Sequence, residues 1–424
     1  MQFSRTVVLA AALFAAVYIA LDFNALYALR ANQNTGLYLQ SALDFVRTGS
    51  TFDQPDGKPH LLVHNQWLLY VVLAPFVALW PRPEMPIVAQ TLALAAAALP
   101  LFAFARACGT SARNATLLAI AFLVSPSMQG WAYDGFVGED FIPIVAFSFA
   151  LALRRRSFAG TLLCAQLLLG IKEDEAWFLA WFGTLVALGC FRARDERAPR
   201  AAADRERMLG LAVVALALAN GLAYYAVASR LGYAPEHPRY GFVDRQWPQQ
   251  LTFLIEMLVP FAFAPLLLRW RVLAALPFFI ELFLAQDRTY PLYHIGAYYT
   301  VPLVVCAALA TAYVAAHVPN VARYALAGSL VMAGLFNNAS VVHLGRRPFS
   351  RDPQYKLARS WATTTLPVDF PCEDVGAWTV ASPDPNARLV GCGAPASRSP
   401  RPAWRDVPLG ATTPWTRGPQ ASRR

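Results

Sequence analysis

Charged residues interrupt an apolar region of the chain at Lys172, Glu173 and Asp174. Charges at membrane depth are costly and usually face a cavity. Lys172 is one of three lysines among 424 residues, and a lysine ammonium can bind phosphate as a compact point charge. The pattern predicts that these three residues bind a substrate. A tight hydrated turn with a local ion pair is the alternative.

A second polar segment places three carboxylates between two apolar stretches, at Asp134, Glu139 and Asp140. Carboxylates beside a cavity can act as a general base or hold a divalent cation. These are the candidate catalytic residues, and the presence of a metal ion is left open. A solvated loop would explain them equally, because acidic side chains are favoured where a helix begins.

Two histidines adjoin apolar stretches in a similar way: His64 precedes the run that starts at Trp67, and His294 precedes Tyr298. Both are predicted to bind substrate, and a purely structural role is the alternative for each. Glu281 lies within an apolar stretch and is expected either to line the same cavity or to extend to the membrane surface. The chain has no Walker loop, dinucleotide-binding glycine motif or H-E-x-x-H motif, which argues against ATP-driven transport.

These residues must be positioned by a membrane-embedded framework, because the composition does not suit a soluble protein. The chain is 57% hydrophobic and only 15% charged, with a mean hydropathy of +0.38, whereas soluble domains carry about 25% charged residues. The formal net charge is +10. Because most arginines lie between apolar stretches, they indicate contact with membrane lipids rather than with nucleic acid.

A membrane-spanning helix needs about 20 apolar residues. An all-α polytopic protein of about eleven transmembrane helices is therefore predicted, with spans at 6–28, 86–105, 114–129, 141–153, 157–171, 175–191, 208–229, 250–268, 272–286, 297–317 and 322–343. The apolar run Trp67–Trp80 is shorter and ends at a proline, which is typical of a helix lying at the membrane surface.

Arginine placement fixes the expected orientation. If 67–80 does not cross the membrane, the clusters Arg154–Arg156 and Arg192–Arg207 share the side of Arg5. Cytoplasmic loops carry the excess of positive charge, so the N-terminus is predicted to be cytoplasmic. All the candidate site residues named above then lie at the outer face.

The predicted organisation has three parts. Residues 1–343 form the transmembrane domain, whose first outer loop, 29–85, contains the surface helix 67–80. Residues 344–392 form a small extracytoplasmic segment, in which Cys372 and Cys392 could pair. Residues 393–424 are rich in proline, serine, arginine and glycine and are predicted to be disordered.

Several segments together resemble a family of predicted bacterial membrane proteins, the domain of unknown function 2079. The resemblance covers about residues 30–310 and is strongest at the Lys-Glu-Asp block. The segments that carry it are Asn34-Thr-Gly36-Leu-Tyr38, His64, Leu73-Ala-Pro75-Phe76, Ala121–Gly130 and Gly170-Ile-Lys172-Glu173-Asp174-Glu175-Ala176.

That family is similar to the membrane glycosyltransferases of the GT-C superfamily. The resemblance implies a GT-C-like fold, a polyprenyl-phosphate sugar as donor, and a catalytic aspartate in the first outer loop followed by helices lying on the membrane. The surface helix 67–80 matches this layout. Asn34 occupies the place where the family usually has aspartate, which marks it as a substrate-binding position, but an amide cannot act as a base. Val137 stands where the family usually has histidine.

The departures leave two readings open. Either Asp134, Glu139 or Asp140 acts as the base, or this member has lost transfer activity. The leading hypothesis is a glycosyltransferase-like protein of the bacterial inner membrane that uses a polyprenyl-phosphate-linked sugar. The alternatives are a non-catalytic lipid or glycan carrier, a flippase, and an envelope-assembly partner. A carrier would need polar groups throughout the membrane, whereas here they gather near one face.

Overall fold

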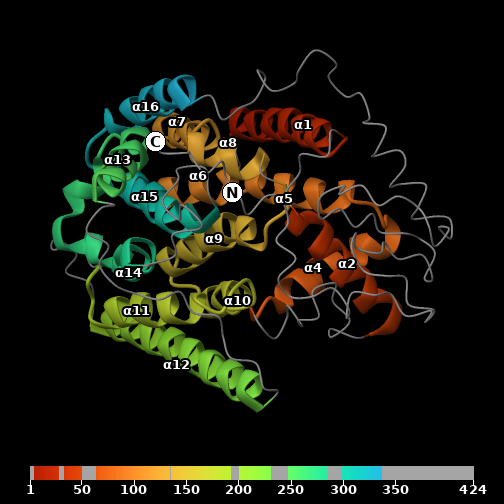
Figure 1. The fold of residues 1–424 in the computed structure, drawn as a ribbon. Coiled ribbons are helices and arrows are strands. Elements are labelled where there is room, and N and C mark those ends of the chain that lie inside the picture. The colour runs from red at the N-terminus through yellow and green to blue at the C-terminus, as the bar shows by residue number, and fades with distance from the viewer. Residues whose placement is uncertain are drawn as a thin grey trace, which may run out of the picture.

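The computed structural model describes residues 4–27, 33–49, 64–133, 135–191, 200–230, 247–284 and 298–336. All regular secondary structure within these ranges is helical, which confirms the prediction of an all-α protein (Figure 1). The predicted segments 344–392 and 393–424, including Cys372 and Cys392, lie outside the described residues.

The α-helices are α1 (Arg5–Tyr27), α2 (Gln33–Thr48), α4 (Trp67–Leu79), α5 (Glu84–Ala96), α6 (Ala98–Ala107), α7 (Ala112–Leu123), α8 (Pro126–Tyr133), α9 (Ile142–Arg154), α10 (Phe158–Leu168), α11 (Glu175–Ala187), α12 (Arg200–Arg230), α13 (Trp247–Leu258), α14 (Leu276–Leu284), α15 (Val301–Val314) and α16 (Val321–Phe336). The 3-10 segments are η1 (Gly138–Phe141), η2 (Val259–Phe261), η3 (Ala264–Ala275), which is kinked at Arg269, and η4 (Tyr298–Thr300).

Three helical segments of the described residues are long and apolar enough to cross a membrane: Arg5–Leu26, Glu84–Ala107 and Ala203–Arg230. A fourth candidate is the pair Ala112–Leu123 and Pro126–Tyr133, which is bent by 46°. The other apolar helices have 10 to 17 residues. The structure therefore supports a membrane protein with three or four full-length candidate spans.

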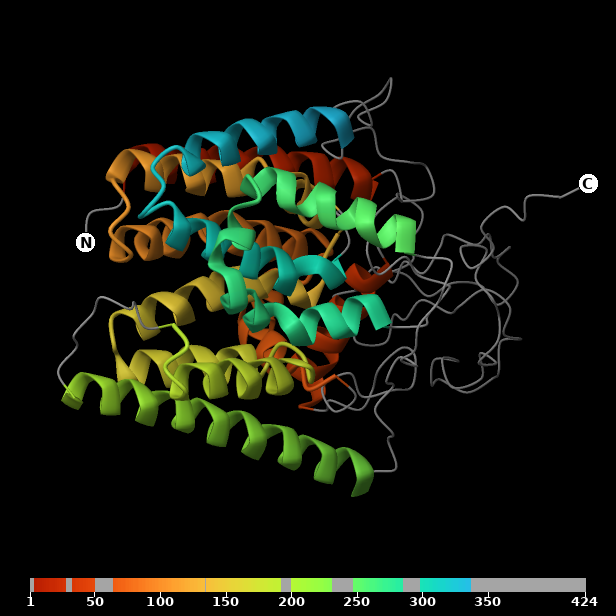
Figure 2. The same ribbon diagram turned by 90° about the vertical axis from the view of Figure 1, so that its left-hand side faces the viewer.

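Most of the helices run roughly side by side, as Figure 2 shows, with α12 along one edge of the bundle and α16 at the opposite edge. α12 packs along α11, and their backbones approach closely at two glycines. A Cβ on Gly210 would lie 2.7 Å from the Gly183 carbonyl oxygen. Small residues at helix contacts are what allow membrane helices to pack this closely.

The region predicted as one span at 250–268 contains a break instead. α13 ends at Leu258, and the backbone is left-handed at Ala262 and Phe263, with φ of 53° and 54°. Pro260 and Pro265 flank this turn. Because proline lacks the N–H that an α-helix needs, the two prolines give a physical reason for the break.

The span predicted at 114–129 is likewise divided, into α7 and α8, and the one predicted at 272–286 begins in η3 and continues in α14, whereas several other predicted segments coincide with helices. The spans predicted at 6–28, 141–153, 157–171 and 175–191 correspond to α1, α9, α10 and α11, and the surface helix predicted at 67–80 corresponds to α4. α12 begins eight residues before the span predicted at 208–229 (200 against 208), because its first two turns are charged but still helical.

Candidate functional site

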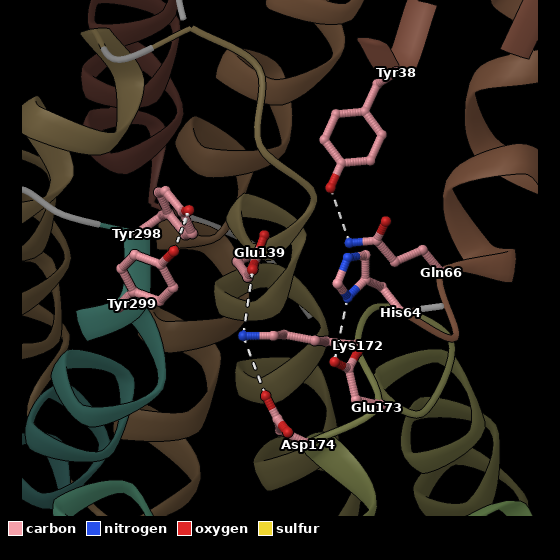
Figure 3. A network of polar contacts seen from close by, with 9 residues as sticks. All are labelled: Tyr38, His64, Gln66, Glu139, Lys172, Glu173, Asp174, Tyr298 and Tyr299. Carbon is pink, nitrogen blue, oxygen red and sulfur yellow. Dashed lines mark hydrogen bonds and ion pairs between the residues drawn. The ribbon is translucent and has the colours of Figure 1, made fainter. Parts of the chain in front are cut away.

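Lys172 lies in the short turn between α10 and α11, and its ammonium is at the centre of a polar cluster (Figure 3). Its Nζ lies 3.1 Å from Oδ2 of Asp174 and 3.6 Å from Oε1 of Glu139. The ring of Tyr299 lies beneath the same ammonium, with its centroid 5.6 Å away. The lysine therefore joins the α10–α11 turn to η1 and to the start of α15.

Glu139 is placed by a backbone segment that is held from three sides. The Phe136 N–H donates to Oγ1 of Thr35 and the Val137 N–H donates to Oε1 of Gln90, each at 2.8 Å. A Cβ on Gly138 would lie 2.7 Å from Cδ1 of Leu69, so any larger residue here would require the Leu69 side chain to move. These contacts with neighbouring helices fix the backbone before Glu139, and this backbone places the Glu139 side chain in the cluster.

His64 and Glu173 form a third ion pair of the cluster. Nδ1 of His64 lies 3.3 Å from Oε1 of Glu173, whose side chain is buried. Burial lowers the pKa of His64, but the hydrogen bond and negative charge of Glu173 outweigh it, so the net pKa is raised above its ordinary value. Glu173 thus favours the protonated form of His64.

The start of α4 is fastened to the turn that carries Lys172. The Leu68 N–H donates to the Gly170 carbonyl at 2.9 Å, and Nδ2 of Asn65 donates to the Leu169 carbonyl at 2.8 Å. A Cβ on Gly170 would meet the Trp67 ring at 2.3 Å. The first predicted outer loop and the Lys-Glu-Asp block therefore form one unit.

Aromatic hydroxyls line the cluster. Nε2 of Gln66 donates to the Tyr38 hydroxyl at 2.9 Å, and the Tyr298 hydroxyl donates to that of Tyr299 at 2.6 Å. Burial, followed by the negative charge of Glu139, raises the pKa of Tyr38 far above its ordinary value. Tyr38 therefore stays protonated and can donate a hydrogen bond.

Three buried oxygens of the cluster have no hydrogen-bond partner among the described residues: Oε2 of Glu139, Oε2 of Glu173 and Oε1 of Gln66. Each belongs to a side chain of a residue that is at most 7% exposed. Buried polar atoms are almost always satisfied by protein, water or a ligand. The three oxygens thus define places where a donor group from a hydroxylated ligand would be stabilised.

The ammonium of Lys172 remains charged in this setting. Burial lowers its pKa, but Asp174, Glu139, Glu281 and Glu173 together raise it well above the ordinary value. Glu281 of α14 thus acts electrostatically on Lys172. The cluster combines a fixed cation, an excess of carboxylates and several hydroxyl donors.

The structure brings together five of the nine residues predicted from sequence: His64, Glu139, Lys172, Glu173 and Asp174. Asp140 adjoins Glu139 in η1 and is completely buried. Asn34 belongs to the first turn of α2, but its side chain lies outside what the structure describes. Asp134 and His294 are also outside the described residues.

Sequence reasoning did not assign roles to four residues at the site. Tyr298 and Tyr299 carry no local signal beyond being aromatic residues at the edge of an apolar stretch, and Tyr38 belongs only to the motif that carries the family resemblance. Gln66 gave no signal beyond being polar beside Trp67. In the described ranges, no group of three or more histidine, cysteine, aspartate or glutamate side chains is arranged to hold a metal ion. The question of a divalent metal ion, left open by the sequence, therefore stays open.

A family model described as a predicted membrane protein, DUF2079, matches residues 25–364. The chain belongs to this family. The match spans the whole polar cluster, from Tyr38 to Tyr299, and agrees with the resemblance carried by the Lys-Glu-Asp block. No curated protein and no solved structure matches this DUF2079 chain significantly. The family match thus supports a membrane protein and assigns no reaction to it.

Proposed function

We propose that this DUF2079 protein is an integral-membrane glycosyltransferase of the GT-C type that takes its sugar from a polyprenyl-phosphate donor. The observation that carries the proposal is the placement of Lys172 against Glu139, whose Oε2 is buried and has no partner among the described residues. A cation for a phosphate and a base for a hydroxyl thereby lie within one cluster.

The proposed topology is about eleven spans in a bacterial inner membrane, with residues 1–343 as the transmembrane domain and the C-terminal segments outside the cytoplasm. The positions of the clusters support it. η1 leads into α9 at the polar cluster, and α11 and α15 also begin there, whereas Arg154 ends α9. With arginines at the cytoplasmic side, the polar cluster and α4 belong to the outer side.

In the proposed reaction, Lys172 binds the donor phosphate, and protonated His64 and the tyrosine hydroxyls supply further donors. An acceptor hydroxyl attacks the anomeric carbon of the sugar. The bond between that carbon and the phosphate oxygen breaks, and polyprenyl phosphate leaves with the bonding electron pair. Oε2 of Glu139 takes the hydroxyl proton, while Lys172 stabilises the charge on the phosphate.

The buried acceptor oxygens of Glu173 and Gln66 suit the hydroxyl groups of a sugar rather than a phosphate. Oε2 of Glu173 and Oε1 of Gln66 are buried acceptors, and sugar hydroxyls are donors that could satisfy them. Asn34 would contact substrate without acting as a base, and Asp134, Asp140 and His294 remain proposed contributors. No step requires a metal ion.

A non-catalytic carrier of lipids or glycans is the second candidate, supported by Asn34 and Val137 at positions where the family usually has aspartate and histidine. An envelope-assembly partner would need none of the acids. The buried acceptor oxygens favour transfer or binding of a hydroxylated ligand over a purely structural role.

Donor binding tests the proposal. The purified full chain is incubated with a panel of polyprenyl-phosphate sugars and examined by native mass spectrometry, with free polyprenyl phosphate as the control ligand. We expect one sugar-bearing donor to be retained more strongly than polyprenyl phosphate, because the buried acceptors recognise the sugar. Failure to retain any donor, or equal retention of the unglycosylated lipid, would contradict the proposed specificity.

Cysteine accessibility tests the orientation. Asp56→Cys is expected to react with an impermeant thiol reagent in intact cells, and Ala202→Cys only after lysis, because the two positions lie on opposite proposed sides. Both are compared with unsubstituted protein, whose native cysteines set the background. The reverse labelling pattern would place the polar cluster in the cytoplasm and rule out an outer-leaflet donor.

A further inference from the structure

A cavity of about 380 Å³ lies among α9, α11, α12, α13 and α15, with η3 along it. Its body is apolar, formed by residues such as Leu153, Phe182, Leu254 and Leu303. Four arginines also line it: Arg154, Arg156, Arg205 and Arg271, with Glu206 as the acidic member of the lining. The cavity thus combines a hydrophobic interior with an excess of positive charge.

The cavity lies towards the opposite ends of the helices that begin at the polar cluster. α9 runs from η1, which carries Glu139, to Arg154, and α15 runs from Tyr299 and its neighbours to Tyr313. A helix of 13 residues is about 20 Å long. The two sites are therefore separate, and the arginine-lined cavity lies on the side that the orientation proposed above makes cytoplasmic.

Arg271 is held in place for binding an anion. Its Nε donates to the Cys190 carbonyl at 3.1 Å, one terminal nitrogen donates to the Tyr313 hydroxyl at 3.2 Å, and the guanidinium lies 5.6 Å from the centroid of the Tyr313 ring. These contacts order the guanidinium beside the cavity. A fixed guanidinium binds phosphate with little additional loss of side-chain freedom.

Arg156 has an unusual backbone. It follows α9 with a φ of 55°, a conformation in which glycine or asparagine is normally preferred. The turn is closed by hydrogen bonds from the Arg156 N–H to Leu153 and from the Ser157 N–H to Ala152. A long cationic side chain is therefore presented at the edge of the cavity by a turn that normally favours a smaller residue.

We infer that this cavity binds an anionic diacyl phospholipid of the membrane, with an acyl chain in the apolar interior and the phosphate headgroup among the four arginines. Charge complementarity selects an anionic lipid over a zwitterionic one, and arginine is the side chain best suited to phosphate oxygens. The site is distinct from the proposed donor site and does not depend on transfer activity.

Native mass spectrometry of the full chain tests this inference, with phosphatidylglycerol and phosphatidylcholine of identical acyl chains as probes. We expect preferential retention of phosphatidylglycerol. The double variant Arg154→Gln/Arg271→Gln should retain it roughly tenfold less strongly. Arg323→Gln is the matched control, because Arg323 is an arginine at the start of α16 that does not line the cavity.

A second variant tests the interior without altering charge. Ala310 lines the cavity from α15, and Ala310→Leu should weaken retention of both lipids by occupying the space of an acyl chain. Equal retention of the two lipids by the unsubstituted protein, or unchanged retention in both variants, would overturn the inference. Thermal unfolding of each variant in detergent separates loss of binding from loss of fold.

Discussion

Replacing Lys172 with methionine is expected to reduce retention of a polyprenyl-phosphate sugar by about 10- to 100-fold, because a hydrogen bond to a charged group contributes about 1.5–3 kcal/mol. Methionine keeps a similar side-chain length and removes the charge. Glu139 and Asp174 would then lose the cation that each contacts. Breaking such a partly buried pair should also lower the free energy of unfolding by about 3 kcal/mol.

The comparison needs variants that separate binding from folding. Lys172→Arg keeps the positive charge and should restore most of the stability, while the different shape of the guanidinium weakens retention. Arg82→Met removes an exposed cation before α5 and should change neither property. Native mass spectrometry and thermal unfolding provide the two measurements. Undiminished donor retention by a folded Lys172→Met variant would exclude the proposed phosphate contact.

Glu139→Gln is expected to slow sugar transfer by about 10²–10⁴-fold, the usual contribution of a general base, while the fold and donor retention are kept. The amide oxygen can still accept from Lys172, but the side chain can no longer take a proton. Transfer is measured as release of polyprenyl phosphate from the retained donor in the presence of a cell-envelope extract that supplies acceptors.

Asp174→Asn provides the matched comparison for Glu139→Gln. It removes one negative charge that also contacts Lys172, so a purely electrostatic effect would appear equally in both variants. We expect transfer by Asp174→Asn to fall by less than about tenfold, because the proposed proton transfer does not involve it. Equal losses in the two variants would remove the base role from Glu139.

The sequence predicted an all-helical membrane protein because apolar periodicity is a local property. Of the eleven predicted spans, the described residues contain three that are long and apolar enough to cross a membrane, or four with the bent pair. The sequence also identified the Lys-Glu-Asp block, since charges between apolar stretches are exceptional. It could not show that η1 lies against α4, which depends on the close approach of Gly138 to Leu69. The pairing of Lys172 with Glu139 joins residues 33 positions apart (172 − 139) and has no local signal.

Gln66 illustrates a further limit of reading the sequence alone. Its type does not distinguish a surface glutamine from one whose side chain is buried beside a tyrosine hydroxyl. Only the attachment of α4 to the α10–α11 turn gives it a role. Similarly, Pro260 and Pro265 predict a disturbed helix, but no local signal shows that this segment packs closely against α16, where a Cβ on Gly328 would lie 2.3 Å from the Val259 carbonyl oxygen.

The unequal lengths of the helices determine how deep the polar cluster lies in the proposed topology. α12 has 31 residues and is about 46 Å long, whereas α9 and α11 have 13 residues each and are about 20 Å long. A bilayer has a hydrocarbon core of about 30 Å. This hydrophobic mismatch means that the charged turn at Lys172 would be recessed below the outer headgroups, and the lipids beside α9 and α11 would have to thin around it. A lipid-linked sugar could then reach the cluster without its phosphate being pulled fully out of the bilayer.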